Sequence, residues 1–286
     1  MLQAKKSLGQ NFLINPHILE KIVSAAEISK DDIVLEIGPG TGNLTKELAR
    51  KAGKVIAIEK DRRLIEYLKN KFSTKYAIAQ NVEVIEGDIL KLNIRELFEN
   101  CKLPALGQAE ARPGKIENSH YKVVSNIPYY ITSHLLREIF EKWPAPKLIV
   151  LMVQKEVAQR IIAKPPHMNL LALSVQYYSE PEIIGYISKN NFRPVPKVDS
   201  AIIKLVLSSK YQVLRGGGEE KKMFELMKAG FSEKRKQLAG TLSKKLKIDK
   251  EKIQKPLVKI GANETARPEV LSLNQWQKLN KSLSGE

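Results

Sequence analysis

The sequence predicts an α/β fold, in which a parallel sheet is covered by helices on both faces and a small α-helical C-terminal domain follows. Two observations lead to this prediction. Short apolar runs alternate with amphipathic segments through residues 16–163, and the runs are apolar at successive positions, as in strands that are buried on both faces. After residue 208 the apolar residues keep helical spacing to the end of the chain.

Each predicted element has its own signal. Apolar residues recur every three or four positions in the expected helices, which are 16–30, 43–52, 61–72, 132–141 and 154–163. Continuous apolar runs mark the expected strands, which are 32–37, 55–58, 82–85, 121–125 and 148–153. Two later strands, 182–187 and 201–207, are close enough in sequence to form an antiparallel pair at a sheet edge. Residues 101–119 contain Pro and Gly without periodicity and predict a long surface loop.

Composition excludes several classes of protein. The 286 residues contain one cysteine, Cys101, which rules out an intrachain disulfide and a thiolate-rich metal site and fits a reducing cytoplasm. The four histidines are scattered, so no metal is expected. The longest apolar stretch, 148–153, is far shorter than the ~20 residues that span a bilayer, and the N-terminus lacks the apolar core of a secretory signal. We therefore expect a cytoplasmic protein with no membrane partner, and nothing in the sequence indicates a self-complementary interface, so we expect a monomer.

The net charge of +17 indicates a polyanionic partner, because basic side chains gain by releasing counterions from phosphates. A generally lysine-rich proteome is the alternative explanation. The charge is unevenly spread, since residues 208–286 hold 18 basic and 9 acidic residues. With the glycine-rich hinge at 215–218, this predicts two domains, at 1–208 and 209–286.

A glycine-rich turn follows the first predicted strand and opens a helix. Gly38, Gly40 and Gly42 in Glu-Ile-Gly-Pro-Gly-Thr-Gly allow the backbone to turn tightly beside a ligand at a helix N-terminus. A dinucleotide fingerprint would need Gly or Ala at position 43, where Asn stands, so the spacing favours S-adenosylmethionine. Glu59 and Asp88 end the next two strands, where they would bind the ribose hydroxyls and the adenine amine.

The tetrapeptide Asn126-Ile127-Pro128-Tyr129 ends the fourth strand and predicts methylation of an exocyclic amine. The lone pair of such a nitrogen is delocalised. If the Asn126 side-chain oxygen and the Ile127 carbonyl each accept an N–H, the nitrogen moves toward tetrahedral geometry and frees its lone pair. Pro128 fixes the turn, and Tyr129 offers a stacking face for a flipped base. The motif leaves open adenine N6, cytosine N4 and a glutamine amide.

With these motifs in place, the chain resembles the ribosomal RNA adenine N6,N6-dimethyltransferases, in particular the small-subunit (KsgA/RsmA-type) branch, along nearly its whole length. The matching segments are 7–13, 36–42, 126–129, 154–158, 174–178 and 192–201. The resemblance implies a Rossmann-like S-adenosylmethionine methyltransferase that dimethylates two adjacent adenosines in the 3′-terminal hairpin of small-subunit (16S) rRNA during ribosome assembly.

The resemblance also implies roles for individual residues. Asn11 and Leu13 would bind the cofactor together with Gly38, Glu59, Asp88 and Asn126. Phe192 would stack on the target adenine opposite Tyr129. In the C-terminal domain Lys234, Arg235 and Lys236 would meet RNA phosphates, and Lys197 would do so beside the Phe192 loop.

Three other functions share these features. The family includes enzymes that methylate large-subunit (23S) rRNA and confer macrolide resistance. Some relatives are RNA-binding assembly or transcription factors that have lost turnover. Protein-glutamine methyltransferases have a similar Asn-Pro motif. Residues 192–200 and the basic tail favour the small-subunit branch, and the intact Glu59, Asp88 and Asn126 favour an active enzyme.

Overall fold

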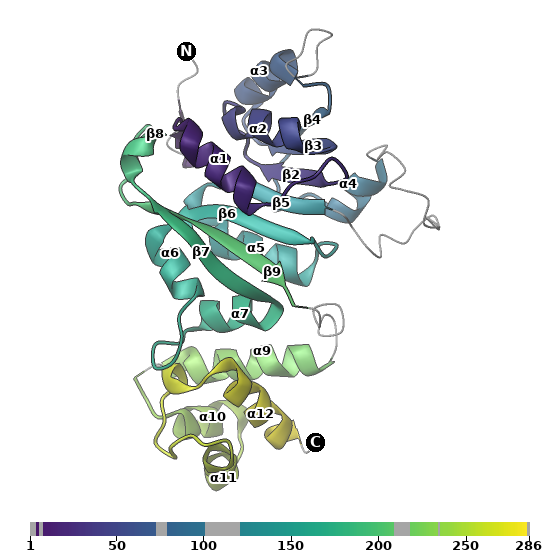
Figure 1. Ribbon diagram of the computed structural model, residues 1–286. Coiled ribbons are helices and arrows are strands. Elements are labelled where there is room, and N and C mark those ends of the chain that lie inside the picture. The colour runs from purple at the N-terminus through teal and green to yellow at the C-terminus, as the bar shows by residue number, and fades with distance from the viewer. Residues whose placement is uncertain are drawn as a thin grey trace. The chain divides into compact units, whose positions relative to one another are not determined.

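The computed structural model describes residues 4–5, 8–72, 79–100, 121–208, 218–233 and 235–284 (Figure 1). They form two compact units, Met1–Ala158 with Glu182–Leu207 and Gln159–Pro181 with Ser208–Glu286. The second unit includes residues 159–181, which we expected in the first domain. The predicted loop 101–119 and Lys234 lie outside the described residues.

A seven-stranded sheet organises the first unit. Its strands are β2 (Ile33–Ile37), β3 (Lys54–Glu59), β4 (Val82–Glu86), β5 (Tyr121–Asn126), β6 (Leu148–Gln154), β7 (Ser179–Ile187) and β9 (Ser200–Leu207). Their order across the sheet is β4-β3-β2-β5-β6-β9-β7. The first five run parallel, and β9 pairs antiparallel with β6. The predicted parallel sheet is confirmed, and the two late strands lie side by side at its edge.

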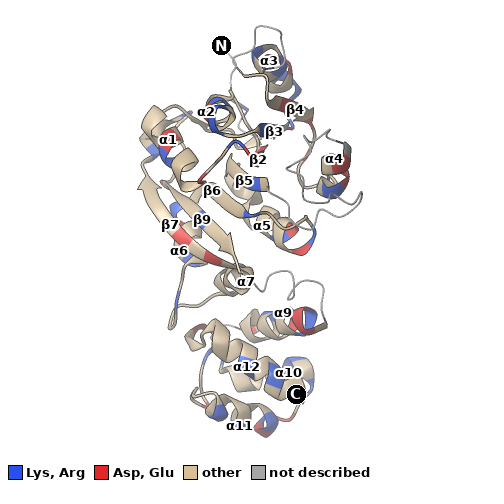
Figure 2. Ribbon diagram, turned by 45° about the vertical axis from the view of Figure 1, so that its right-hand side comes forward, with Lys and Arg blue, Asp and Glu red and all other residues tan. Residues whose placement is uncertain are grey.

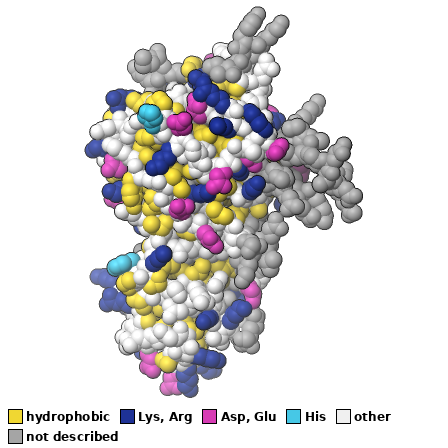
Figure 3. Space-filling model, viewed as in Figure 1, with side chains coloured by type: hydrophobic (Ala, Val, Ile, Leu, Met, Phe, Trp, Pro, Cys, Tyr) yellow, Lys and Arg dark blue, Asp and Glu magenta, His cyan; other side chains and the backbone are white. Residues whose placement is uncertain are grey.

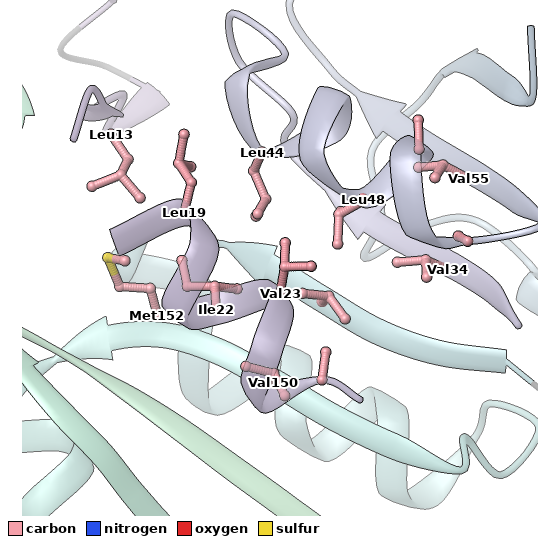
Figure 4. Close-up of a cluster of buried hydrophobic side chains, with 14 of the residues drawn as sticks. Leu13, Leu19, Ile22, Val23, Val34, Leu44, Leu48, Val55, Val150 and Met152 are labelled. Atoms are coloured by element: carbon pink, nitrogen blue, oxygen red, sulfur yellow. The ribbon is translucent and has the colours of Figure 1, made fainter. Parts of the chain in front are cut away.

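Helices cover both faces of this sheet. They are α1 (Pro16–Ala25), α2 (Asn43–Lys51), α3 (Arg62–Phe72), α4 (Ile94–Asn100), α5 (Thr132–Glu141) and α6 (Lys155–Ile161). Side chains of α1 and α2, such as Ile22 and Leu48, pack on Val34, Val55 and Val150 of one face (Figure 4). The intervening strand positions are also fully buried, as strands covered on both sides require.

The first helix is shorter than predicted. We expected it to reach residue 30, but α1 ends at Ala25 and Glu27 has a positive φ of 49°. A left-handed residue cannot continue an α-helix. The side chain of Asp32 holds the following turn by accepting hydrogen bonds from the backbone N–H and hydroxyl of Ser29.

A second, two-stranded sheet has no signal in the sequence. Strand β1 (Phe12–Leu13) pairs antiparallel with β8 (Phe192–Arg193), with Leu13 opposite Phe192. Two residues are too few to show periodicity, and the partners are 180 positions apart in sequence. The pairing holds the N-terminal segment against the loop that contains Phe192.

The second unit is helical, as predicted. Its helices are α7 (Leu170–Tyr178), α9 (Gly218–Gly230), α10 (Leu238–Leu246), α11 (Glu251–Lys259) and α12 (Leu273–Ser284). The indole of Trp276 on α12 is fully buried and stacks on Phe231 with ring centroids 5.8 Å apart. Gly230 allows this approach, because a Cβ at that position would lie 2.4 Å from the indole. No helix among the described residues is long and apolar enough to cross a membrane.

A buried ion pair links β5 to the start of β2. The Lys122 ammonium lies 2.9 Å from the Asp32 carboxylate, and both side chains are almost fully buried. Burial raises the pKa of Asp32, but hydrogen bonds from Lys122 and Ser29 outweigh it and hold that pKa below its usual range. The charged pair is therefore the stable form.

We expect Lys122→Met to lower the free energy of unfolding by about 3–5 kcal/mol, because it leaves the Asp32 carboxylate buried and uncompensated. Urea unfolding at neutral pH measures the loss. The double variant Lys122→Met, Asp32→Asn also removes the uncompensated charge and should recover part of the lost free energy of unfolding. Equal destabilisation of the single and double variants would show that the charge is not the cause.

Candidate active site

The carboxyl ends of four parallel strands line one pocket in the first unit. The glycine turn follows β2, Glu59 ends β3, Asp88 follows β4 and Asn126 ends β5. This edge of an open α/β sheet is where ligands bind, since the loops after parallel strands diverge there. The pocket wall also includes Asn11, Leu13, Gly38, Gly40, Ile127, Pro128 and Tyr129.

The glycine turn needs its glycines for steric reasons. Gly40 and Gly42 have φ values of 60° and 74°, which L side chains rarely adopt. A Cβ on Gly40 would lie 2.8 Å from the Phe12 ring, and one on Gly42 would lie 2.6 Å from the Phe72 ring. Gly42 precedes α2 and does not itself line the pocket. The ammonium of Lys71 donates to the carbonyl of Thr41 at 2.8 Å and holds the turn from α3.

Glu59 is oriented by backbone N–H groups. One carboxylate oxygen accepts from Lys60 and Asp61 at 2.8 and 2.9 Å, and the other accepts from Gly40 at 3.3 Å. Burial raises the pKa of Glu59 even though these three hydrogen bonds oppose it. Each carboxylate oxygen has two lone pairs, so the fixed carboxylate keeps acceptor capacity toward the pocket.

Asp88 forms an ion pair that the sequence did not suggest. Its carboxylate lies 2.9 Å from the ammonium of Lys60, which is exposed. The hydrogen bond from Lys60 holds the pKa of Asp88 below its usual range. The second carboxylate oxygen accepts from the Leu90 N–H at 3.2 Å. The carboxylate is therefore charged and fixed at the pocket rim.

Glu36 is a buried carboxyl in the pocket wall. It is 1% exposed, and among the described residues its Oε2 has no hydrogen-bond partner. The buried hydroxyl of Thr45 lies near this carboxyl and opposes the rise in its pKa, although the two groups do not reach the geometry of a full hydrogen bond. Burial raises the pKa of Glu36 to about 8, and the neighbouring Glu59 adds to the rise. A buried acceptor without a donor is costly, so this atom is suited to a ligand with N–H groups.

Asn126 is held by the N-terminal segment. Its side-chain N–H donates to the backbone carbonyl of Asn11 at 3.1 Å. That contact uses the donor end of the amide and turns Oδ1, the acceptor end, away from it. The pocket thus presents an oriented carbonyl oxygen beside the turn that contains Ile127 and Pro128.

The two aromatic residues of the predicted base site lie in different surroundings. Tyr129 lines the pocket, and its hydroxyl forms a 2.5 Å hydrogen bond with that of Ser200 on β9. Burial raises the pKa of Tyr129, so the phenol stays protonated. Phe192 is fully buried in the core cluster and does not line the pocket. Its stacking on a target base remains a prediction.

Residues 8–13 form one wall of the pocket and are anchored at both ends. The Gln10 amide donates to the buried carboxylate of Asp61 at 3.1 Å. The Asn43 amide, on α2, donates to the carbonyl of Leu13 at 3.1 Å. The Asp61 carboxylate also pairs with Arg63 at 2.7 Å, which lowers its pKa far below the usual range.

Comparison with known proteins identifies the family. A family model described as ribosomal RNA adenine dimethylase matches residues 1–284. The chain belongs to this family. It is 40% identical to ribosomal RNA small subunit methyltransferase A of Dehalococcoides mccartyi over 99% of this chain and 90% of that protein. It is 37% identical to the protein of the same name from Bacillus cytotoxicus, over 98% and 91% of the two chains.

Two solved structures are similar to the whole chain. A dimethyladenosine transferase from Plasmodium falciparum shares 29% identity over 94% of this chain and 95% of its own, with a TM-score of 0.72. The 23S rRNA methyltransferase ErmE shares 27% identity over 96% and 100%, with a TM-score of 0.68. The predicted resemblance and the Rossmann-like methyltransferase fold are therefore confirmed.

As a member of the adenine dimethylase family the chain is an rRNA adenine methyltransferase, and S-adenosylmethionine is its methyl donor. The pocket fits this cofactor. The cofactor carries a sulfonium and an ammonium, and three acidic side chains line the wall, those of Glu36, Glu59 and Asp88. Oε2 of Glu36 is buried without a hydrogen-bond partner among the described residues, and the glycine turn brings the backbone of Gly38 and Gly40 into the pocket wall.

Sequence reasoning missed several residues of this dimethylase site. Lys60, Asp61 and Lys71 act through contacts that join positions 28 to 51 residues apart in sequence. Asp61 had a usable signal, because it follows Glu59, the carboxylate predicted to bind the ribose, by two positions. Of the predicted RNA-binding residues, Lys197, Arg235 and Lys236 are exposed, and Lys236 pairs with Glu233 at 2.7 Å.

The carboxyl of Glu36 predicts a pH dependence of stability. Its pKa is about 8 when folded and near 4.5 when unfolded, so between these values the folded state holds a proton that the unfolded state has released. The free energy of unfolding should therefore fall as the pH rises from about 4.5 to 8, by up to ~1.4 kcal/mol per pH unit. Glu36→Gln cannot titrate and should lack this component.

Urea unfolding of both proteins between pH 5 and 8 tests this. The free energy of unfolding of Glu36→Gln, relative to that of the parent chain, should increase as the pH rises. Glu99→Gln, at an exposed position of α4, is the matched control and should change the free energy little at any pH. A difference between Glu36→Gln and the parent that is the same at every pH would contradict the prediction.

Proposed function

We propose that the chain dimethylates N6 of two adjacent adenosines in the 3′-terminal hairpin of 16S rRNA, acting as a monomer on assembling small ribosomal subunits in the cytoplasm. The proposed activation of the amine rests on one observation. The donor end of the Asn126 amide is held by the carbonyl of Asn11, so the acceptor end is available to a substrate amine. The small-subunit names of relatives that are 37–40% identical over nearly the full chain support the choice of RNA.

The residues of the pocket would activate the amine by hydrogen bonding. Asn126 Oδ1 and the Ile127 carbonyl would each accept one N–H of the adenine amine, which frees the nitrogen lone pair. Pro128 sets the angle between these acceptors. S-adenosylmethionine supplies an electrophilic methyl group on its sulfonium. The amine becomes more acidic as it is methylated, so its proton can leave to solvent and no dedicated base is needed.

The remaining predicted residues would position the two substrates. Glu59 would accept the ribose hydroxyls and Asp88 the adenine amine of the cofactor, while Asn11, Leu13 and the glycine turn enclose it. Tyr129 is held by Ser200, which gives the target base a fixed ring to stack on. Phe192 would stack on the opposite face, and this would require the base to reach a side chain that is buried.

Three alternatives are disfavoured by particular observations. A role on 23S rRNA would follow the name of ErmE, but that chain is 27% identical whereas the small-subunit relatives reach 40%. A factor without turnover would not need a buried, unpartnered carboxyl in the pocket wall or an oriented amide at Asn126. The glutamine methyltransferase is disfavoured by the family match.

The second unit would bind RNA phosphates. Lys and Arg residues recur along its helices (Figure 2), and on the face shown in Figure 3 their side chains are mixed with acidic ones. Arg235, Lys236, Lys244 and Arg267 line one open cavity of this unit together with Glu233. Glu233 pairs with the two lysines, at 2.7 and 3.6 Å, which leaves the two exposed arginines as the cations best placed for phosphate.

Methyl transfer to unmethylated small subunits tests the proposed function. Labelled S-adenosylmethionine should yield dimethyladenosine in small-subunit RNA and none in large subunits assayed in parallel. Asn126→Ala should lower kcat by about 10²–10³-fold, the usual loss when one preorganised hydrogen-bonding group is removed. Product on large-subunit RNA would move the chain to the 23S group. Absence of product with the cofactor still bound would favour a binding factor.

Arg235→Ala should weaken binding to small subunits by the loss of one phosphate contact. The slope of log affinity against log salt, measured between about 50 and 200 mM, should become shallower by about one. Arg50→Ala is the matched control, because Arg50 is an exposed residue of α2 paired with Glu47. The phosphate role is wrong if both variants change the slope equally.

A further inference from the structure

Tyr130 is an exposed aromatic residue of the pocket wall. Its side chain is 65% exposed, whereas its neighbour Ile131 is 7% exposed and Tyr129 is partly buried with its hydroxyl bonded. All three belong to one short 3₁₀ helix, η2 (Tyr129–Ile131), directly after the Asn126 motif. An aromatic ring left in water adds little to folding, so its place at the site needs another explanation.

The position of the ring is fixed by its surroundings. The backbone of η2 is held by hydrogen bonds from the Ile131 N–H to Pro128 and from the Thr132 hydroxyl to Tyr129. One edge of the Tyr130 ring lies against Gly9, where a Cβ would stand 3.2 Å from Cδ1. Gly9 of the N-terminal segment thus packs against one edge of the Tyr130 ring, and most of the ring stays exposed to solvent.

A cation lines the same pocket as Tyr130. Lys60, whose ammonium pairs with Asp88, belongs to the pocket wall together with Tyr130. Lys60 is itself exposed at the pocket rim. An open aromatic face in the same pocket wall as an exposed ammonium is the combination that binds nucleotides, through the base and the phosphate respectively.

We propose that Tyr130 is a stacking platform for the base of the nucleotide next to the target adenosine. Both tyrosines line the pocket, but Tyr129 is partly buried and its hydroxyl is bonded to Ser200, so it serves the base that enters the pocket. The Tyr130 ring is mostly exposed to solvent, where the RNA must continue. This inference rests on the proposed function and adds a residue that would hold the neighbouring base by stacking, whatever its identity.

Tryptophan fluorescence gives a direct readout. The two tryptophans of the chain, Trp143 and Trp276, are at most 3% exposed, so they respond little to a surface ligand. Tyr130→Trp should be quenched when an RNA hairpin with two adjacent adenosines binds the protein saturated with S-adenosylhomocysteine. Tyr67→Trp, at an exposed position of α3, is the matched control and should not be quenched.

A mutant cycle identifies the partner of the ring. Tyr130→Ala should weaken binding of the hairpin roughly tenfold or more, whereas Tyr130→Phe should bind normally. With an abasic nucleotide beside the target adenosine, the parent chain and Tyr130→Ala should bind equally. Cofactor affinity, measured by calorimetry, should be unchanged in Tyr130→Ala.

Three results would overturn the proposal. These are quenching of Tyr130→Trp by cofactor alone, absence of quenching by RNA, and an equal loss of affinity on the intact and abasic hairpins. None of them depends on turnover. If the parent chain produces dimethyladenosine and one of these results is found, the inference fails while the proposed function stands. If no product forms, the fluorescence still reports whether a base stacks on Tyr130.

Discussion

The parallel register of β2 with β3 and β5 decides where the groups of the site lie. Ile37 pairs with Ile58, and Leu35 pairs with Val123, so the three strands end at one level. Glu59 and Asn126, which are 67 positions apart in the sequence, therefore reach the same pocket. A shift of one residue in this register would turn each side chain to the opposite face of the sheet. The continuous burial of β2 and β5 is what fixes it, because both faces of these strands are packed.

The strands, the glycine turn and the residues that end each strand could be predicted, since their signals are local. An apolar run, a glycine spacing and an acidic residue at a strand end are each visible within a few residues. The closure of the pocket could not be predicted. It depends on residues 8–13, whose contacts with Asp61, Asn43 and Asn126 join separate parts of the chain. The burial of Phe192 could not be predicted either, since it follows from the two-residue pairing with Leu13.

The pocket brings together acidic side chains whose charged form is disfavoured by burial. Glu36 and Glu59 are both buried, and each has a raised pKa because burial disfavours the charged form. A cationic cofactor changes this balance, since a positive charge nearby stabilises both carboxylates. Methyl transfer removes the sulfonium charge and leaves the ammonium and the carboxylate of the cofactor in place. The sulfonium would therefore add to the attraction between the cofactor and these two acidic side chains until the methyl group is transferred.

The N-terminal segment connects this electrostatic pocket to the chemistry on the amine. Gln10 joins it to Asp61, whose backbone N–H orients Glu59, and Asn11 joins it to the amide of Asn126. One short segment thus contacts Asn126, which is proposed to hold the substrate amine, and Asp61, which in turn orients Glu59, the residue proposed to hold the cofactor ribose. Because both contacts are hydrogen bonds of fixed direction, a displacement of this segment would misalign the two substrates together. Alignment matters most in a reaction where the residues move no proton themselves, since positioning is then the main contribution that the protein makes.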